Sequence, residues 1–120
     1  MEIRYLSKDV AITSQVEPGD MERLQKQGFA SLICNRPDAE APLHSPFAQI
    51  EAEARRRGIE ARYLPVVPGQ VTPQDGEAFA ALLGGLPPPV LAYCRTGNRA
   101  ETLWKLAQMG GHAAPLGRCS

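Results

Sequence analysis

The sequence predicts an α/β fold with a mostly parallel central sheet flanked by helices. Short apolar segments of strand type alternate along the chain with helix-type segments of about ten to fifteen residues, as is typical of parallel sheets. The last apolar segment runs directly into a glycine-containing loop and a helix. In parallel sheets, ligand sites form where such loops follow the carboxyl ends of the strands. With 120 residues, 43% of them hydrophobic, we expect a single domain over residues 1–120, in which residues 112–120 form a mobile tail.

The first third of the chain predicts a hairpin, a helix and a buried strand. The β-prone segments 3–6 and 10–13 flank a polar turn, which favours a hairpin. Pro18 suits the first turn of a helix that Gly28 ends. Residues 29–34 are mostly apolar, so this strand is expected to be covered on both faces of the sheet.

The middle of the chain predicts a second helix followed by a strand. Ser45 is expected as the N-cap and Pro46 as the first helical residue, and apolar residues then recur at helical spacing until Gly58. Residues 61–67 follow as a strand. The polar segment 68–70 then predicts a turn.

The last third predicts two further helices around a central strand. Thr72 and Asp75 are expected to cap a helix that ends at the proline run 87–89. Residues 90–93 form the central strand, and the final helix is expected to close at the glycine pair 110–111.

The run Cys94-Arg95-Thr96-Gly97-Asn98-Arg99 is the candidate active site. The loop amides and the free N–H groups of the first helical turn point at one spot, which suits an anion. A helix N-terminus and cationic neighbours favour the thiolate form of a cysteine, so a cysteine at the rim of this pocket is a candidate nucleophile. Cys94 and Arg99 are expected to be catalytic. Arg95, Thr96, Gly97, Asn98 and Ala100 are expected to bind the anion. The alternative is a core cysteine beside a surface arginine.

The spacing within this loop resembles two enzyme families. Four residues separate Cys94 from Arg99, as in the persulfide loop of rhodanese-type sulfurtransferases, whereas protein tyrosine and dual-specificity phosphatases have five. A smaller ring of amides fits a single sulfur atom more readily than a tetrahedral phosphate.

Other short motifs are spread along the chain: Gln15, Gly28-Phe29, Asn35-Arg36-Pro37-Asp38, Pro65-Val66-Val67-Pro68-Gly69, Thr72 and Leu91-Ala92-Tyr93 before the loop. Through them the chain from residue 12 to 106 resembles the phosphatase-like domain of bacterial beta-lactamase-hydrolase-like proteins, some of which are described as sulfurtransferases. The resemblance implies a dual-specificity-phosphatase-like sandwich that carries a rhodanese-sized loop. Relatives are often fused to, or encoded beside, persulfide dioxygenases. The chain has no H-x-H-x-D-H metal motif, so such a partner is expected as a separate protein or as a part that lies outside this chain.

The chemistry of the loop leaves three hypotheses. A phosphatase similar to the dual-specificity enzymes needs an acid in the loop after residues 63–67, but residues 68–74 contain no Asp, Glu or His. Asp75 is interpreted as a helix cap, and Asp38 could replace the acid or form a turn.

Sulfur transfer needs no general acid, because its leaving groups are stable anions. The preferred hypothesis is therefore a rhodanese-like sulfurtransferase of sulfide or persulfide metabolism, in which Cys94 carries sulfane sulfur from thiosulfate or glutathione persulfide. A cysteine-dependent phosphatase and a non-catalytic anion-binding module are the alternatives.

The remaining candidate residues receive simpler interpretations. Arg36 could line the pocket or hold the loop through a salt bridge. Cys34 is expected to be a core thiol, and Cys119 could resolve a persulfide from the tail. His44 and His112 lack the spacing of metal ligands, so neither a metal nor a cofactor is predicted.

The charge balance limits the expected partners. Thirteen basic residues match thirteen acidic ones, which gives no field toward nucleic acid or an anionic membrane. No signal segment or long apolar run predicts membrane insertion, so a cytoplasmic protein is expected. The expected partners are small sulfur donors and thiol acceptors, with a persulfide dioxygenase or a sulfide:quinone oxidoreductase as protein partners.

Overall fold

The computed structural model describes residues 2–40 and 45–113, with side chains to residue 109. Its elements follow one another as β1 (Arg4–Tyr5), β2 (Val10–Thr13), the 3-10 helix η1 (Pro18–Asp20), α1 (Met21–Lys26), β3 (Ser31–Cys34), the 3-10 helix η2 (Asp38–Glu40), α2 (Phe47–Arg56), β4 (Glu60–Tyr63), α3 (Pro73–Gly85), β5 (Val90–Tyr93) and α4 (Asn98–Ala113).

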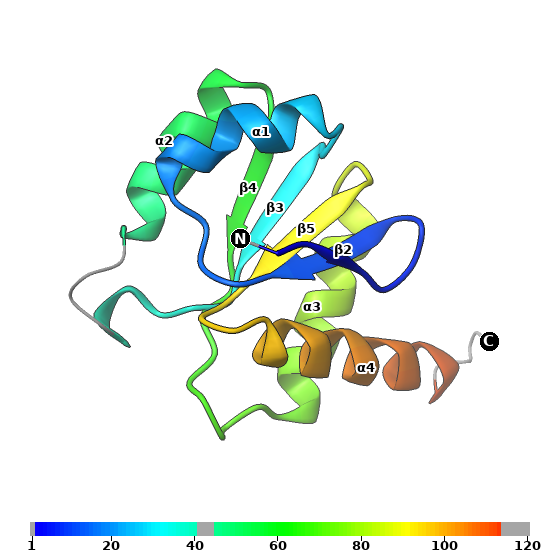
Figure 1. Ribbon diagram of the computed structural model, residues 1–120. Coiled ribbons are helices and arrows are strands. Elements are labelled where there is room, and N and C mark those ends of the chain that lie inside the picture. The colour runs from blue at the N-terminus through cyan, green and yellow to red at the C-terminus, as the bar shows by residue number, and fades with distance from the viewer. Residues whose placement is uncertain (1, 41–44, 114–120) are drawn as a thin grey trace.

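The five strands form one sheet in the order β1-β2-β5-β3-β4. β1 pairs antiparallel with β2, whereas β2 and β3 pair parallel with β5, and β4 pairs parallel with β3. β5 therefore lies at the centre of the sheet (Figure 1). The four parallel strands end at the same edge, so the segments that follow them meet there.

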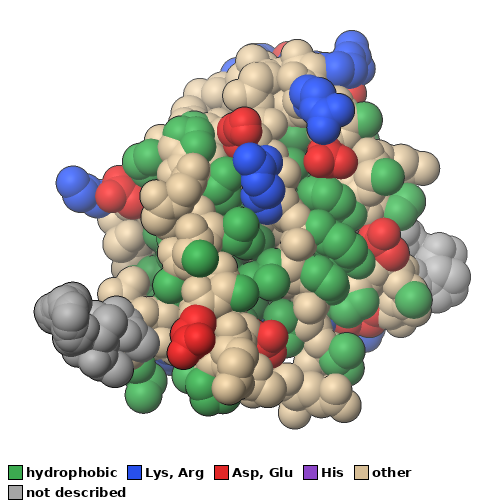
Figure 2. Space-filling view, turned by 180° about the vertical axis from the view of Figure 1, so that it is seen from behind, with side chains coloured by type: hydrophobic (Ala, Val, Ile, Leu, Met, Phe, Trp, Pro, Cys, Tyr) green, Lys and Arg blue, Asp and Glu red, His purple; other side chains and the backbone are tan. Residues whose placement is uncertain are grey.

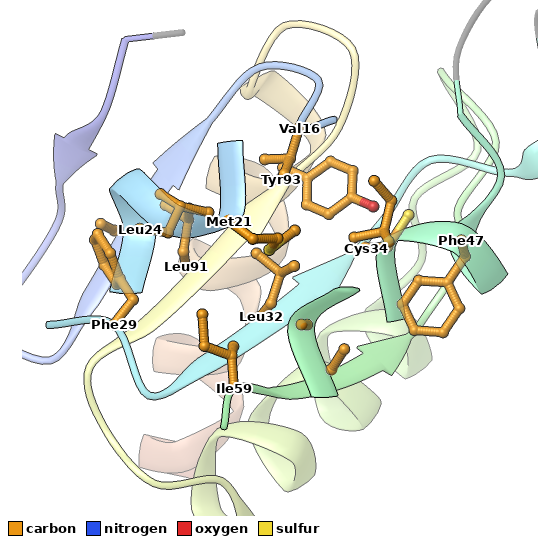
Figure 3. Packing of buried hydrophobic residues seen from close by; sticks show 14 residues of the cluster. Val16, Met21, Leu24, Phe29, Leu32, Cys34, Phe47, Ile59, Leu91 and Tyr93 are labelled. Carbon is orange, nitrogen blue, oxygen red and sulfur yellow. The ribbon is translucent and has the colours of Figure 1, made fainter. Parts of the chain in front are cut away.

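Helices cover both faces of the sheet, with α1 and α2 on one face and α3 and α4 on the other (Figure 1). The strands bury side chains on both sides: in β5, Leu91 and Tyr93 pack under α1 and α2, and Ala92 packs under α3 and α4. Figure 3 shows the first of these two cores, in which Met21 and Leu24 of α1 contact the sheet. The α/β fold with a mostly parallel sheet is thus confirmed, and the two covered faces explain the continuous apolar runs.

The second core is less completely covered than the first. Its rim includes partly buried hydrophobic side chains from the segment after β4 and from α3 and α4: Leu64, Leu82, Leu83 and Trp104. On the side opposite to the view of Figure 1, hydrophobic side chains gather in the middle of the face (Figure 2).

Most helix starts follow the sequence prediction. Pro18 opens η1, which leads directly into α1, and Thr72 caps α3 in a capping box with Asp75. The prediction that Ser45 is the N-cap of α2 was wrong, because Pro46 holds that position. The N–H of Phe47 donates to Asp38 Oδ1 at 2.8 Å, so a residue from the preceding turn supplies the cap.

Two predicted boundaries also differ. β4 ends at Tyr63 rather than at residue 67, because its partner strand β3 ends at Cys34, the residue paired with Tyr63. The N–H groups of Leu64 and Val66 still donate to the carbonyls of Cys34 and Asn35, but outside regular strand pairing. α4 continues past Gly110 and Gly111 to Ala113; a glycine costs about 1 kcal/mol inside a helix without ending it. His44, the His112 side chain, Cys119 and the tail beyond residue 113 lie outside the described residues.

Helix length and hydropathy also bear on membrane insertion. Within the described ranges, none of the helices combines the length and the apolar character needed to span a bilayer.

Candidate active site

The loop between β5 and α4 places Cys94 directly below the start of a helix. Cys94 is fully buried (0% exposed), and its Sγ accepts the N–H of Gly97 at 3.0 Å. The loop can turn this way because Gly97 has a φ of +94°, a conformation that favours glycine. The structure thus places the sulfur beneath the loop, where the Gly97 N–H points at it, rather than at the predicted rim.

Arg99 belongs to the first turn of α4 and points back across the carboxyl edge of the sheet. Its Nη1 donates to Glu40 Oε1 at 2.6 Å and to the Val66 carbonyl at 2.8 Å, and its Nη2 donates to Glu40 Oε2 at 2.8 Å. The side chain is only 10% exposed. Arg99 is therefore fixed by a two-pronged ion pair, which sequence reasoning had not predicted.

Glu40 and Arg36 extend this ion pair into a network. Arg36 Nε donates to Glu40 Oε2 at 3.0 Å, and its Nη1 donates to Gln15 Oε1 at 2.8 Å. Both charged side chains are largely buried, at 7% and 13% exposed. Of the two roles considered for Arg36, the structure places it in a salt bridge that supports the loop rather than in the wall of the cavity.

The flanking arginines set the charge state of Glu40. Hydrogen bonding from the Arg99 guanidinium, and then from Arg36, holds the pKa of the Glu40 carboxyl below its usual range, against the opposing effect of burial. Glu40 is therefore an ionised carboxylate near neutral pH.

A cavity of about 580 Å³ opens beside this network. Its lining comes from η2, from the segment after β4, from the loop between β5 and α4, and from the start of α4: Glu40, Pro68, Gly69, Val71, Arg95, Thr96, Asn98, Arg99 and Thr102. Arg95, Thr96 and Asn98 are exposed in it. The cavity therefore presents two guanidinium groups and several polar side chains around the loop, which suits an anionic ligand.

Other predicted site residues lie outside the cavity. The side chain of Ala100 is buried in the core under α3 and α4, so only its backbone can face the loop. The Asp38 carboxylate accepts the N–H of Phe47, and the Asp75 carboxylate accepts the N–H of Thr72. Cys34 lies in the opposite core, where burial raises the pKa of its thiol.

Comparison with known proteins identifies the family. Residues 2–111 match the family described as "Beta-lactamase hydrolase-like protein, phosphatase-like domain". The chain belongs to this family.

Curated relatives match this chain over one part of their length. A beta-lactamase hydrolase-like protein of Xylella fastidiosa (strain Temecula1 / ATCC 700964) is 29% identical over 91% of this chain, which spans 25% of that protein. The chain thus covers about a quarter of the length of the curated relatives it matches.

Solved structures show that the phosphatase-like domain shares its fold with phosphatases of the protein tyrosine and dual-specificity type. A crystal structure from Neisseria meningitidis Z2491, solved as that of a candidate phosphatase, is 34% identical with a TM-score of 0.85 and covers 96% of this chain and 81% of that one. Tk-PTP shares the fold at 15% identity, with a TM-score of 0.61 over 95% of this chain and 83% of that one. The fold expected from the resemblance is confirmed.

The sequence analysis did not predict Glu40 as a residue of the candidate site. The local signal was the spacing of Arg36 and Glu40, four residues apart in a predicted turn. Its contact with Arg99, 59 residues away, has no sequence signature.

Proposed function

We propose that this domain is a cysteine-dependent phosphatase that hydrolyses phosphate monoesters. The supporting observation is the arrangement of the loop: the sulfur of the buried Cys94 accepts the Gly97 N–H, and Arg95 and Arg99 from the two ends of the same loop line the cavity. The membership of the phosphatase-like family supports the same reaction.

The reaction would proceed in two steps at Cys94. The sulfur attacks phosphorus, an S–P bond forms, and the P–O bond to the leaving group breaks. Water then attacks the phosphorus, which releases inorganic phosphate and restores the thiolate. Arg99 and the loop amides stabilise the charge of the phosphoryl oxygens in both steps. The leaving alkoxide or phenoxide takes its proton from solvent in this scheme.

An aryl phosphate tests this proposal, because its phenolate leaving group needs little protonation. We expect turnover by the wild type and a loss of at least about a thousandfold in kcat for Cys94→Ser. Arg99→Lys keeps the charge but loses the forked donors, so kcat should fall about a hundredfold. Cys34→Ala is the matched control, since Cys34 lies in the opposite core, and it should retain activity. Lack of turnover by the folded wild type would refute the proposal.

Sulfur transfer is the second candidate, and a specific observation favours it. Four residues separate Cys94 from Arg99, and the carboxylates of Asp38 and Asp75 are used as helix caps. In this reaction the Cys94 thiolate attacks the sulfane sulfur of a persulfide or thiosulfate, and an S–S bond forms while the donor's bond to that sulfur breaks and a thiolate or sulfite leaves. An acceptor thiolate then attacks the outer sulfur and becomes a persulfide, and the Cys94 thiolate is restored. A persulfide dioxygenase would be the protein partner.

Intact mass after incubation with thiosulfate or glutathione persulfide distinguishes the two candidates. A gain of one sulfur that is absent in Cys94→Ser, together with no turnover of the aryl phosphate, would establish sulfur transfer instead. One residue inserted between Cys94 and Arg99 should then widen the ring of amides and raise the ratio of phosphatase to sulfurtransferase activity. An unchanged ratio in a folded variant would show that loop size does not select the chemistry.

A further inference from the structure

Arg95 is an unpaired cation in the wall of the cavity. Nine of the basic side chains in the described ranges pair with a carboxylate: Arg4, Lys26, Arg36, Arg55, Arg56, Arg57, Arg62, Arg99 and Lys105. Within the same ranges, the exposed side chain of Arg95 forms neither an ion pair nor a hydrogen bond of standard geometry, although it lines the cavity. Its charge and its donors are therefore available to a ligand.

The carboxylate in the cavity wall is fully used by other groups. Among the residues that line the cavity, Glu40 alone is acidic. Its Oε1 accepts from Arg99 at 2.6 Å, and its Oε2 accepts from Arg99 at 2.8 Å and from Arg36 at 3.0 Å. Because two guanidinium groups already share this carboxylate, the charge of Arg95 is not compensated inside the cavity.

The side chains of Cys94 and Arg95 turn in different directions, although the two residues are neighbours in the loop. Cys94 is fully buried (0% exposed), and its sulfur lies beneath the loop, where it accepts the N–H of Gly97. Arg95 is exposed and lines the cavity, whereas Cys94 is not one of the lining residues. The guanidinium of Arg95 is therefore placed for a group other than the one that reacts at the sulfur.

The rest of the cavity wall suits the organic part of a small molecule. The segment after β4 contributes Pro68, Gly69 and Val71, which carry no charge. The volume of about 580 Å³ lies within the range of about 300–1,000 Å³ that is typical of pockets for whole small molecules. A phosphoryl group alone leaves most of this space empty. The cavity thus combines an uncharged wall with a free cation.

We propose that Arg95 binds a second anionic group of the substrate, so that the domain prefers small phosphate monoesters that carry a carboxylate or a second phosphate. This rests on the proposed function, because the phosphoryl group that reacts at Cys94 is the first anion. A carboxylate and a phosphate present the same chemistry to a guanidinium, since each offers two oxygens to parallel N–H groups. Arg95 is then the residue that determines specificity.

The test uses esters of the same shape that differ in one charge. The 3- and 4-carboxyphenyl phosphates carry the second anion, and their carboxamides are the neutral counterparts. A carboxamide withdraws electrons more strongly than a carboxylate, so leaving-group chemistry alone favours the carboxamides. We expect the wild type to prefer the better of the two carboxylates over its carboxamide by at least about tenfold in kcat/KM, as for a charge-assisted hydrogen bond.

A third ester distinguishes the two kinds of second anion. In 4-(phosphonomethyl)phenyl phosphate a phosphonate replaces the carboxylate. A higher kcat/KM for this ester than for the carboxylates would assign the second group as a phosphate. A lower value, with the carboxylates still preferred to their carboxamides, would assign it as a carboxylate.

Arg95→Gln should lower the preference for the carboxylate by at least about tenfold. The preference is a ratio of two substrates, so a general loss of activity in this variant cancels. Arg23→Gln is the matched control, because Arg23 of α1 is also exposed and unpaired in the described ranges but lies outside this cavity. It removes the same charge and should keep the preference within about twofold.

Two results would overturn the inference. One is equal kcat/KM of the wild type for the carboxylates and their carboxamides. The other is a preference that survives Arg95→Gln. In particular, a loss of activity that is equal for both esters would assign Arg95 to the reacting phosphoryl group.

Calorimetry in the Cys94→Ser background separates this inference from the proposed function. Tungstate, a tetrahedral oxyanion without a second group, probes the site at the loop. We expect Arg95→Gln to weaken binding of the carboxylate ester at least about tenfold more than binding of tungstate. That result without turnover by the wild type would refute the proposed function and support the second anion site. Equal weakening of both ligands, or no binding of the ester, would overturn the inference.

Discussion

At the scale of single residues, Tyr93 places a hydroxyl group inside the core. Tyr93 is fully buried (0% exposed), and its hydroxyl has no hydrogen-bond partner of standard geometry in the part of the chain that the structure describes. Figure 3 shows it pointing toward Cys34. Burial raises the pKa of the Tyr93 hydroxyl and of the Cys34 thiol, so both groups stay neutral.

Tyr93→Phe should therefore leave the protein as stable as the wild type, or more stable by up to about 1 kcal/mol. The substitution removes a buried polar group that gains little from its surroundings and preserves the packing of the ring. Urea unfolding of the two proteins measures the difference. A loss of more than about 1 kcal/mol would reveal a hydrogen bond to the hydroxyl.

The Glu40 carboxyl predicts a pH dependence of stability. Its pKa in the folded protein is lowered from 4.5, so the folded state favours the ionised form. A group with a lowered folded pKa stabilises the protein above its unfolded pKa, and this contribution is lost as the pH falls through the folded value. The loss should thus begin near pH 4.5 and continue below it.

Urea unfolding of wild type and Glu40→Gln at several pH values tests this prediction. We expect the wild type to be more stable by about 1–3 kcal/mol at pH 7, as for hydrogen bonds to charged groups. The difference should shrink below pH 4.5. A difference that is constant from pH 7 to pH 3 would contradict the assignment, since the glutamine does not titrate.

At the scale of elements, the contact between α3 and α4 depends on one glycine. A Cβ added to Gly76 would lie 2.5 Å from Leu106 Cβ, which is backbone-fixed and cannot move aside. Gly76→Ala should therefore push the two helices apart and destabilise the protein by about 1–3 kcal/mol, although alanine favours helix.

Gly84→Ala is the matched control for this prediction. It lies near the end of the same helix, and nothing comes within 4 Å of an added Cβ. It should leave stability unchanged or raise it by up to about 1 kcal/mol. Equal effects of the two substitutions in thermal unfolding would show that α3 and α4 do not pack closely at Gly76.

The sequence predicts a helix start well when the residues that cap the helix lie close to that start in the sequence. Thr72 and Asp75 satisfy each other within one turn, so the start of α3 follows from neighbouring residues. The start of α2 does not, because its cap comes from Asp38, nine residues before Phe47. Ser45 has the right chemistry for a cap, but a residue brought in by the tertiary fold takes the position.

At the scale of the whole molecule, the candidate site divides into a predictable and an unpredictable part. Cys94, Gly97 and Arg99 are close in sequence, so the loop and the helix N-terminus could be inferred from their order. The supporting network could not, since it forms only at the shared edge of the sheet, where Val66 accepts from Arg99, Arg36 donates to Glu40, and Gln15 accepts from Arg36. Parallel topology, rather than any motif, brings these segments together.

The hydrogen-bond network joins segments from Gln15 to Arg99, so it forms only when the chain is fully folded. Ligand affinity should therefore depend on complete folding. A chain in which any of the parallel strands is unpaired lacks an oriented Arg99, so tungstate should bind only the native state. Such a ligand stabilises by about 2.7 kcal/mol at a hundred times its Kd, and Tm should rise with tungstate concentration. In urea, tungstate affinity and the helical signal should disappear together. Affinity that outlasts the helical signal would show that the loop alone makes the site.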